Sequence, residues 1–197
     1  MISSQDMRIL EAKSSIPRAM LMENAGRAVY QIIKQRFDLK DKKILIVCYH
    51  GNNGGDGFVA ARYLCDEAEA DVLFIGDESK LKKEALINFK KIEHNGKIQF
   101  LTDDEVDFDS YDIIIDAILG IGIQSRLNNE ISAIIDDINK SKTYKVSVDI
   151  PTGLNPDTGM TVDKCVNADL IITFHDLKKG LEKLQDKAVV VDIGLPK

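Results

Sequence analysis

The sequence predicts an α/β fold: a three-layer αβα sandwich, Rossmann-like, built on a mostly parallel central sheet. Two observations predict it. Short, continuous apolar segments of strand length alternate along the chain with segments whose apolar residues recur at helical spacing. Continuous apolar segments are typical of parallel strands that helices cover on both faces. We expect one domain over residues 1–197, with no internal repeat or linker.

The first half of the chain predicts three strands and three helices. The expected strands cover residues 44–48, 71–75 and 98–101. The expected helices cover residues 17–36, 58–64 and 81–92. Ser14 and Ser15, followed by Pro17, are typical of a cap and the first helical turn. Gly96 is a typical terminator of the third helix.

The second half predicts four more strands, over residues 111–116, 146–150, 170–174 and 189–193, and a helix over 131–138. In open parallel sheets, ligands bind outside the carboxyl ends of the strands. Four polar or glycine-bearing segments follow strands, at residues 51–57, 116–122, 149–153 and 175–178. One acidic residue after a strand is often only a helix cap. Four such segments at one edge favour a single shared site.

The glycine-rich segment 51–57 lies between a strand and a helix, where backbone N–H groups and the helix dipole converge on an anion. Its Asn-Gly and Asp-Gly pairs are also hairpin signals, but the acidic, alanine-containing stretch 66–70 suits a helix end better than a second strand. Its glycines occupy positions one, four, five and seven, which differs from the dinucleotide fingerprint. The segment therefore indicates a phosphate or nucleotide without identifying it.

Composition excludes several classes of function. The chain has 197 residues, 44% of them hydrophobic, a formal net charge of −6 and a pI near 5.1. The acidic balance argues against a nucleic-acid binder. No apolar stretch is long enough to span a membrane, and the first residues lack a secretory signal. Cys48, Cys65 and Cys165 are scattered, which fits reduced thiols in a cytoplasmic protein.

Six segments together resemble the YjeF N-terminal domain family, whose enzymatic members are NAD(P)H-hydrate epimerases. Gly-Asn-Asn-Gly-Gly-Asp-Gly at 51–57 and Val-Asp-Ile-Pro-Thr-Gly at 148–153 are the most specific of them. The others cover residues 21–26, 116–120, 173–180 and 191–196. The resemblance implies interconversion of the R and S forms of hydrated NADH or NADPH, in which water has added to the dihydronicotinamide ring. It also implies a partner dehydratase, dependent on ADP or ATP, that consumes the S form and is fused to some members.

The same resemblance implies the site residues. Asp149 would lie at the ring and act in catalysis. A potassium ion would be bound by Asn53, Asp116 and Thr152. Glu23, Asn24 and Lys178 are further candidates, because they match the family's motifs. The dinucleotide would be held by Asn52, Asn53, Gly54, Gly55, Asp56, Gly120, Ile121, Gly122, Ile123, Gln124, Ser125 and Arg126.

This chemistry suits the residue types. The hydrated carbon is bonded to the ring nitrogen, whose lone pair can expel hydroxide if an acid donates a proton. Water can then add to the opposite face if a base accepts one, and Asp149 could serve both steps. Opening of the ring to an aldehyde, followed by closure, is an alternative route. Carboxylate, amide and hydroxyl oxygens suit a hard monovalent cation.

Two departures from the family pattern alter the expectation. Tyr49 stands where the family usually has glycine, and His50 stands where Pro or Lys often follows, so His50 is expected either to contact the ligand or to be merely packed or solvated. The segment 175–180 lacks two prolines of the family pattern, at Leu177 and Lys179, so we expect a more mobile loop. The chain ends where the family domain ends, which fits either a free-standing epimerase or one domain of a bifunctional protein.

Two other functions compete. A non-catalytic, dimeric scaffold that binds nucleotides or RNA would use the same fold, but the acid at 149 and the segment 51–57 are both intact. A dehydrogenase is disfavoured by the glycine spacing, and Asp77 is its only support, at the distance expected of a ribose-binding acid. The expected helix over 17–36 lies outside the alternating pattern and has a long apolar face, which predicts a homodimer.

Overall fold

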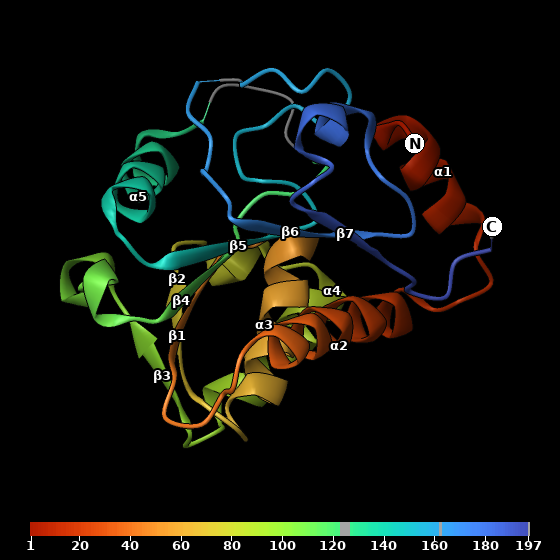
Figure 1. Ribbon diagram of the computed structural model, residues 1–197. Helices are drawn as coiled ribbons and strands as arrows, with labels where there is room; N and C mark the ends of the chain where they lie inside the picture. The colour runs from red at the N-terminus through yellow and green to blue at the C-terminus, as the bar shows by residue number, and fades with distance from the viewer. Residues whose placement is uncertain (123–126, 162, 197) are drawn as a thin grey trace.

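The computed structural model describes residues 1–122, 127–161 and 163–196. The alternation predicted from the sequence is confirmed, and the strands form one seven-stranded sheet in the order β3-β2-β1-β4-β5-β6-β7 (Figure 1). Every strand pair in it is parallel. The strands are β1 Lys43–Cys48, β2 Glu69–Phe74, β3 Ile98–Leu101, β4 Ile113–Ala117, β5 Tyr144–Val148, β6 Leu170–Phe174 and β7 Ala188–Val191.

Helices lie on both faces of this sheet, giving the three expected layers (Figure 1). They are α1 Ser4–Lys13, α2 Arg18–Arg36, α3 Asn52–Leu64, α4 Lys83–Glu93 and α5 Asn129–Lys140, with short 3₁₀ turns η1 Glu78–Lys80, η2 Asp103–Glu105, η3 Phe108–Ser110 and η4 Lys179–Leu184. Alternate residues of β1 face opposite layers. Ile44 and Ile46 pack with α2, α3 and α4, whereas Leu45 and Val47 pack with α5.

The strand order reverses between β1 and β4. From β1 the chain builds outward through β2 to β3, then returns to place β4 on the other side of β1. Such a reversal separates the loops that leave the two strands and opens a crevice at their carboxyl ends, where open α/β sheets bind ligands. The fold therefore places the most favourable binding position at the ends of β1 and β4.

Helix α1 was not predicted. Its sequence has few apolar residues, and only Met7 is deeply buried (2% exposed), so its periodicity is weak. The hydroxyl of Ser3 caps the helix by accepting a hydrogen bond from Asp6 N–H (3.0 Å). The predicted start of α2 also needs correction: Pro17 is its N-cap rather than part of its first turn, and no side chain caps this helix.

The glycine-rich segment is helical from Asn52, six residues earlier than predicted. Its glycines serve close packing of the helix onto the strands. A Cβ at Gly57 would lie 2.6 Å from the Cβ of Ala117 and 2.7 Å from the Sγ of Cys48, and one at Gly54 would collide with the backbone of Tyr49. The segment therefore tolerates its glycines inside a helix because only glycine fits there.

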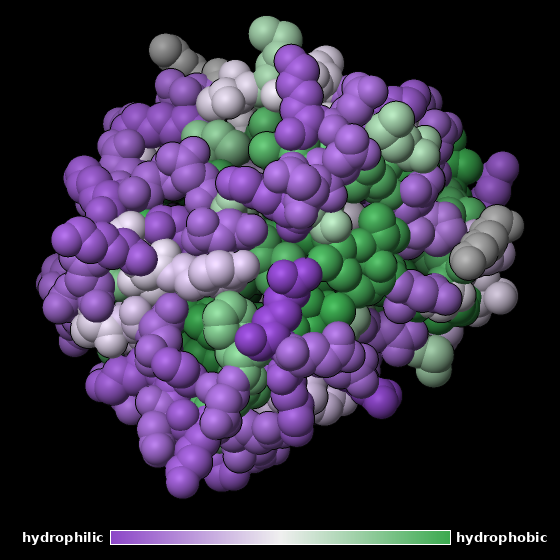
Figure 2. All heavy atoms as spheres, viewed as in Figure 1, coloured by the Kyte–Doolittle hydropathy of each residue, from purple (hydrophilic) through white to green (hydrophobic). Residues whose placement is uncertain are grey.

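The apolar face of α2, on which the homodimer prediction rested, is buried within the chain against α3 and the sheet. The face shown in Figure 2 is mostly hydrophilic, with hydrophobic residues visible near its centre. Within the described ranges, no helix is both long and apolar enough to cross a membrane.

Candidate active site

The predicted clustering of the strand ends is confirmed. β1, β4, β5 and β6 are consecutive neighbours in the sheet and run in the same direction. The segments that follow them therefore emerge side by side at one edge. Each segment contributes at least one of the polar residues described below, and their side chains form two hydrogen-bonded groups with an unpaired amide beside them.

Asn53, in the first turn of α3, is that amide. Its side chain is buried (the residue is 7% exposed), and neither the Oδ1 nor the Nδ2 atom has a hydrogen-bond partner among the described residues. Such a group is costly unless something pairs with it. A Cβ on Gly120 would lie 3.2 Å from the Oδ1 of Asn53 and 3.3 Å from the Oδ2 of Asp149. Gly120 therefore leaves open the space between these two side chains.

Asp116 and Thr152 form the first hydrogen-bonded group. The Thr152 hydroxyl donates to Oδ1 of Asp116 (2.6 Å), and the Thr152 N–H and the Ser147 hydroxyl donate to Oδ2 (2.8 Å each). Asp116 is 1% exposed, and this burial raises the pKa of its carboxyl group although the hydrogen bonds from Thr152 oppose the rise. No lysine or arginine of the described chain pairs with it.

Asp149 and Lys178 form the second group. The Nζ of Lys178 lies 2.6 Å from Oδ1 of Asp149 and also donates to the carbonyl oxygen of Phe174 (2.7 Å) and the hydroxyl of Thr173 (3.1 Å). Lys178 is completely buried. Every side-chain contact of Asp149 with a described residue uses Oδ1, and no described residue donates a hydrogen bond to Oδ2. The carboxylate is thus fixed through one oxygen while the other faces Gly120.

The backbone at Asp149 is strained. Its φ of 65° lies in the left-handed region, and so does the φ of 67° at His175, which follows the neighbouring strand. Such conformations in residues other than glycine persist where the surroundings hold them and are frequent at functional sites. Gly153, predicted to bring the chain close to a ligand, instead brings it against the backbone of Lys164, with a φ of 96°.

A small cavity opens beside this group. Its apolar wall comes from α2, Phe174 and Ile193, and its polar lining consists of Glu11, Arg18, Asn52, Asp56 and Glu84. Burial, followed by the charge of Asp149, raises the pKa of both Glu11 and Asp56, well above the usual value for Asp56. Among the described residues, no three carboxylate, imidazole or thiol groups lie close enough to hold one metal ion. The carboxyl groups of Glu11, Asp56 and Glu84 therefore line the cavity without forming a metal site among the described residues.

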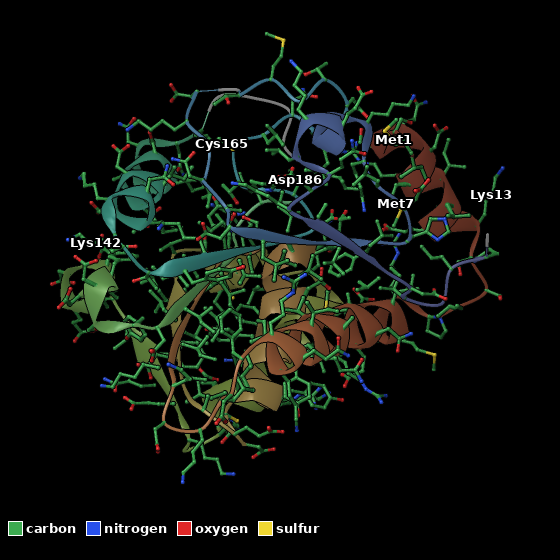
Figure 3. The ribbon with its side chains drawn as sticks, viewed as in Figure 1. Met1, Met7, Lys13, Lys142, Cys165 and Asp186 are labelled. Atoms are coloured by element: carbon green, nitrogen blue, oxygen red, sulfur yellow. The ribbon has the colours of Figure 1, made fainter. Side chains whose placement is uncertain are left out.

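Helix α1 forms one side of this site. Figure 3 shows Met7 on its inner side and Lys13 pointing outward. Arg8 donates to the carbonyl oxygen of Ile121 (2.8 Å), in the segment predicted to hold the dinucleotide. Ile2 forms a parallel bridge with Lys178, so backbone hydrogen bonds hold the loop that lacks the two prolines.

Glu11 is the residue that sequence reasoning missed. Ser3 and Asp6 have the spacing of a capping box. A helix beginning there places Glu11 four residues after the apolar Met7, on the same face. Treating residues 4–13 as a capped helix would have assigned Glu11 to the inner side.

Several predicted residues lie away from the cavity. Glu23 accepts hydrogen bonds from Arg62 (2.5 Å) and Tyr63 (2.6 Å), so it joins α2 to α3. Asn24 donates to the carbonyl oxygen of Ile193 (2.8 Å). Asp77 caps η1 by accepting from Ser79 N–H (2.9 Å), which leaves the dehydrogenase without its only support.

His50 accepts a hydrogen bond from Asp77 N–H (3.3 Å) and stacks on Tyr49, in agreement with the packed alternative. Gly120, Ile121 and Gly122 follow β4 at the site, whereas Ile123, Gln124, Ser125 and Arg126 lie outside the described residues. An open depression of about 540 Å³ lies at the opposite edge of the sheet, near residues 38–41 and 65–69, and none of the predicted site residues lines it.

Known proteins similar to this chain agree with these observations. An "NAD(P)H-hydrate epimerase" of Nitrosopumilus maritimus is 35% identical over 91% of this chain and 86% of its own length, and one of Oenococcus oeni is 35% identical over 93% and 89%. A "Bifunctional NAD(P)H-hydrate repair enzyme Nnr" of Methanothermobacter thermautotrophicus is 43% identical over 92% of this chain. The chain spans 37% of that protein's length and about two fifths of two similar bifunctional relatives.

The fold itself also has a counterpart among solved structures. The crystal structure of the yeast protein ynu0 (YNL200c) superposes with a TM-score of 0.85 over 98% of this chain and 87% of that one, at 22% sequence identity. The sequence profile described as "YjeF-related protein N-terminus" matches residues 18–180, which include α2 and the strands β1 to β6. The chain belongs to the YjeF-related protein N-terminus family.

Proposed function

We propose that this chain is an isomerase that interconverts the R and S epimers of hydrated NADH and NADPH. The observation that carries the proposal is Asp149, a carboxylate fixed through Oδ1 by a buried lysine while Oδ2 faces the space beside Asn53. The names of the relatives that the chain covers almost completely support the substrate class. Proton transfer by a positioned carboxylate is the chemistry that such an epimerisation needs.

Different residues of the chain have different roles in the proposed reaction. The first turn of α3 presents backbone N–H groups and a positive dipole end, which suit the pyrophosphate of a dinucleotide. Phe174 and the apolar residues of α2 exclude water from one side of the ring. Oδ2 of Asp149 exchanges a proton with the hydroxyl on the hydrated carbon or with the incoming water. The ring nitrogen supplies the electron pair that expels hydroxide.

We also propose that a potassium ion binds at Asn53, Asp116 and Thr152. Two observations support the fit: the amide oxygen of Asn53 is buried without a partner, and the buried carboxylate of Asp116 has no cationic side chain beside it within the described chain. These are hard oxygen donors, as such a cation prefers. When bound, the ion would supply positive charge near the phosphates and the developing hydroxide.

The functional partner we propose is a dehydratase, dependent on ADP or ATP, that removes water from the S epimer only. Relatives called bifunctional, more than twice as long as this chain, support a second activity on the same polypeptide in some members. The homodimer stays a prediction.

A coupled assay tests the activity. The purified R epimer of hydrated NADH is mixed with an S-specific dehydratase, and the reappearance of NADH is followed by absorbance with and without this chain. We expect a large acceleration by the wild-type chain. Asp149→Asn keeps the size of the side chain but exchanges no proton near neutral pH, so it should lose about a hundredfold or more in rate.

Binding separates chemistry from recognition in that variant. Asp149→Asn leaves the buried Lys178 without its counter-charge, so urea denaturation first verifies that the variant is folded. The folded variant should still bind hydrated NADH, as measured by calorimetry, since the first turn of α3 is untouched. Near-normal turnover, after subtraction of spontaneous epimerisation, would place the catalytic group elsewhere. A wild-type chain that binds the dinucleotide but never accelerates NADH recovery would favour the scaffold function.

A further inference from the structure

We propose that Glu11, carried by α1, is a second acid–base residue of this site and acts as the proton donor while Asp149 acts as the base. The inference rests on the proposed function and deepens it. It assigns a role to a residue that lies before the part of the chain matched by the family profile.

The first observation is how Asp149 is held. Lys178 is buried completely, and Asp149 is its only carboxylate partner among the described residues. The ammonium group contacts Oδ1, and no described residue donates a hydrogen bond to Oδ2. Oδ2 is therefore the atom of Asp149 that is available to accept a proton.

The second observation is the position of Glu11 in the cavity. Epimerisation through loss of hydroxide needs an acid at the leaving hydroxyl and a base at the incoming water, on opposite faces of the ring. Glu11 lines the cavity beside Phe174, and the backbone N–H of Phe174 lies 3.5 Å from Oδ1 of Asp149. The two carboxyl groups come from different elements, α1 and the end of β5, so they approach the cavity from separate directions.

The surroundings of the Glu11 carboxyl group affect its protonation. Its carboxyl group is partly buried, and it shares the cavity with a second carboxyl group, that of Asp56. Burial and the charge of Asp149 raise the pKa of Glu11, and Lys178, Arg18 and Arg8 oppose the rise. Like charges in one small space favour the protonated form of one of them. The cavity and the carboxyl groups around it therefore favour the protonated form of Glu11 more than an exposed position would.

The charged groups that face Glu11 come from every element around it: Arg8 on α1, Arg18 at the start of α2, Asp56 on α3, Glu84 on α4, and the pair Asp149 and Lys178. Asp56 is the strongest competitor for the donor role. It lies in the second turn of α3, and burial and the charges of Asp149 and Glu11 raise its pKa well above the usual value. Glu11 differs from it in position, because it lies in the last turn of α1, where the negative end of the helix dipole disfavours an ionised carboxylate.

In the proposed reaction, the protons move between Glu11, the substrate, water and Asp149. The Glu11 carboxyl group gives its proton to the hydroxyl on the hydrated carbon, the C–O bond breaks, water leaves, and the nitrogen lone pair forms a C=N⁺ bond. A water molecule then adds to the opposite face, and its proton passes to Oδ2 of Asp149. Solvent water returns the proton from Asp149 to Glu11. Neither an oxidant nor a further reactant is needed.

Kinetics of Glu11→Gln test the proposal. This isosteric variant should lose about a hundredfold in kcat/KM, the lower range for one acid–base group. The wild-type kcat/KM should fall on the alkaline side as Glu11 loses its proton, and this fall should be absent in the variant. Asp6→Asn removes a charge from an exposed position of the same helix and is the matched control.

A truncated variant separates chemistry from structure. Glu11→Ala should regain part of its rate when formate is added, since a small acid can occupy the vacated space, whereas chloride should have no effect. Loss of rate without rescue, together with an unchanged alkaline limb, would show a structural role and overturn the proposal. Rescue in Asp56→Ala but not in Glu11→Ala would assign the donor to Asp56 and also overturn it. A wild-type chain without epimerase activity would refute the proposed function itself.

Discussion

At the scale of single residues, the ion pair between Asp149 and Lys178 fixes the carboxylate on which the proposed chemistry depends. Both members are buried, and the three protons of the ammonium group have three acceptors: Asp149, Thr173 and Phe174. Such an arrangement adds little net stability compared with an apolar pair, but the loss of one partner is costly. The lysine, which could be mistaken for a substrate contact from its position alone, is a positioning residue for Asp149.

Lys178→Met should therefore destabilise the chain by about 3–5 kcal/mol, because it leaves a buried carboxylate without its counter-charge. Denaturation in urea measures the change. Lys145→Met is the matched control: Lys145 is also buried, but it donates to the carbonyl oxygens of Ser141 and Thr143 and pairs with no carboxylate.

The double variant Asp149→Asn, Lys178→Met completes this test. It should recover part of the lost stability, since it contains no unpaired buried charge. Equal losses in the two lysine variants, or no recovery in the double variant, would contradict the pairing argument.

At the scale of elements, the glycine-rich start of α3 shows how packing sets local sequence. Gly54 lies so close to Tyr49 that no Cβ fits, whereas a Cβ on Gly51 would meet nothing within 4 Å. Two glycines of one motif thus serve different ends. One permits contact between the helix and the preceding strand, and the other is conformationally dispensable.

Gly54→Ala should accordingly destabilise the chain by about 1–3 kcal/mol or more, through overpacking against backbone atoms that cannot move aside. Gly51→Ala should remain within about 1 kcal/mol of wild type, because its φ of −83° suits alanine. Thermal unfolding of both variants checks the contrast, and a larger loss in Gly51→Ala would refute it.

The elements also show what the sequence could predict. Strands were predictable because apolar runs such as 44–48 and 113–115 are buried on both faces and carry an unambiguous pattern. The boundary of α3 was not, because close packing overrides the low helix propensity of glycine. Helix α1 was missed because Met7 is the only one of its apolar residues that is deeply buried, and much of its attachment is polar, through Ser4 and Arg8. Because α1 was absent from the prediction, the side of the candidate site that carries Glu11 was absent from it as well.

At the scale of the whole molecule, ion binding should stabilise every element together, since a ligand that binds only the folded chain shifts the global unfolding equilibrium. Adding potassium chloride should raise the melting temperature of the wild type more than sodium chloride does at equal ionic strength. The difference between the two salts should vanish in Asp116→Ala. Equal responses to both salts in the wild type would count against the proposed ion site.

The whole-molecule arrangement also shows which predicted site residues lie together. Asp116, Asp149, Asn53 and Lys178 come together because parallel strands end at one edge, which the alternation of strands and helices already implied. Glu23 and Asn24 belong to an equally recognisable motif, yet they join helices and the C-terminal segment. A motif match alone does not say which of its residues lie at one edge of the sheet, and the topology does.

The position of α1 has a consequence for how this protein can be divided or recombined. The family profile matches from Arg18 onward, whereas the contacts that enclose the cavity begin at Ile2 and include Arg8 and Glu11. A chimera joined at residue 18 would inherit the sheet's binding edge but take its first wall from another parent. Exchange of the first seventeen residues between relatives should therefore alter the proposed turnover more than it alters the fold.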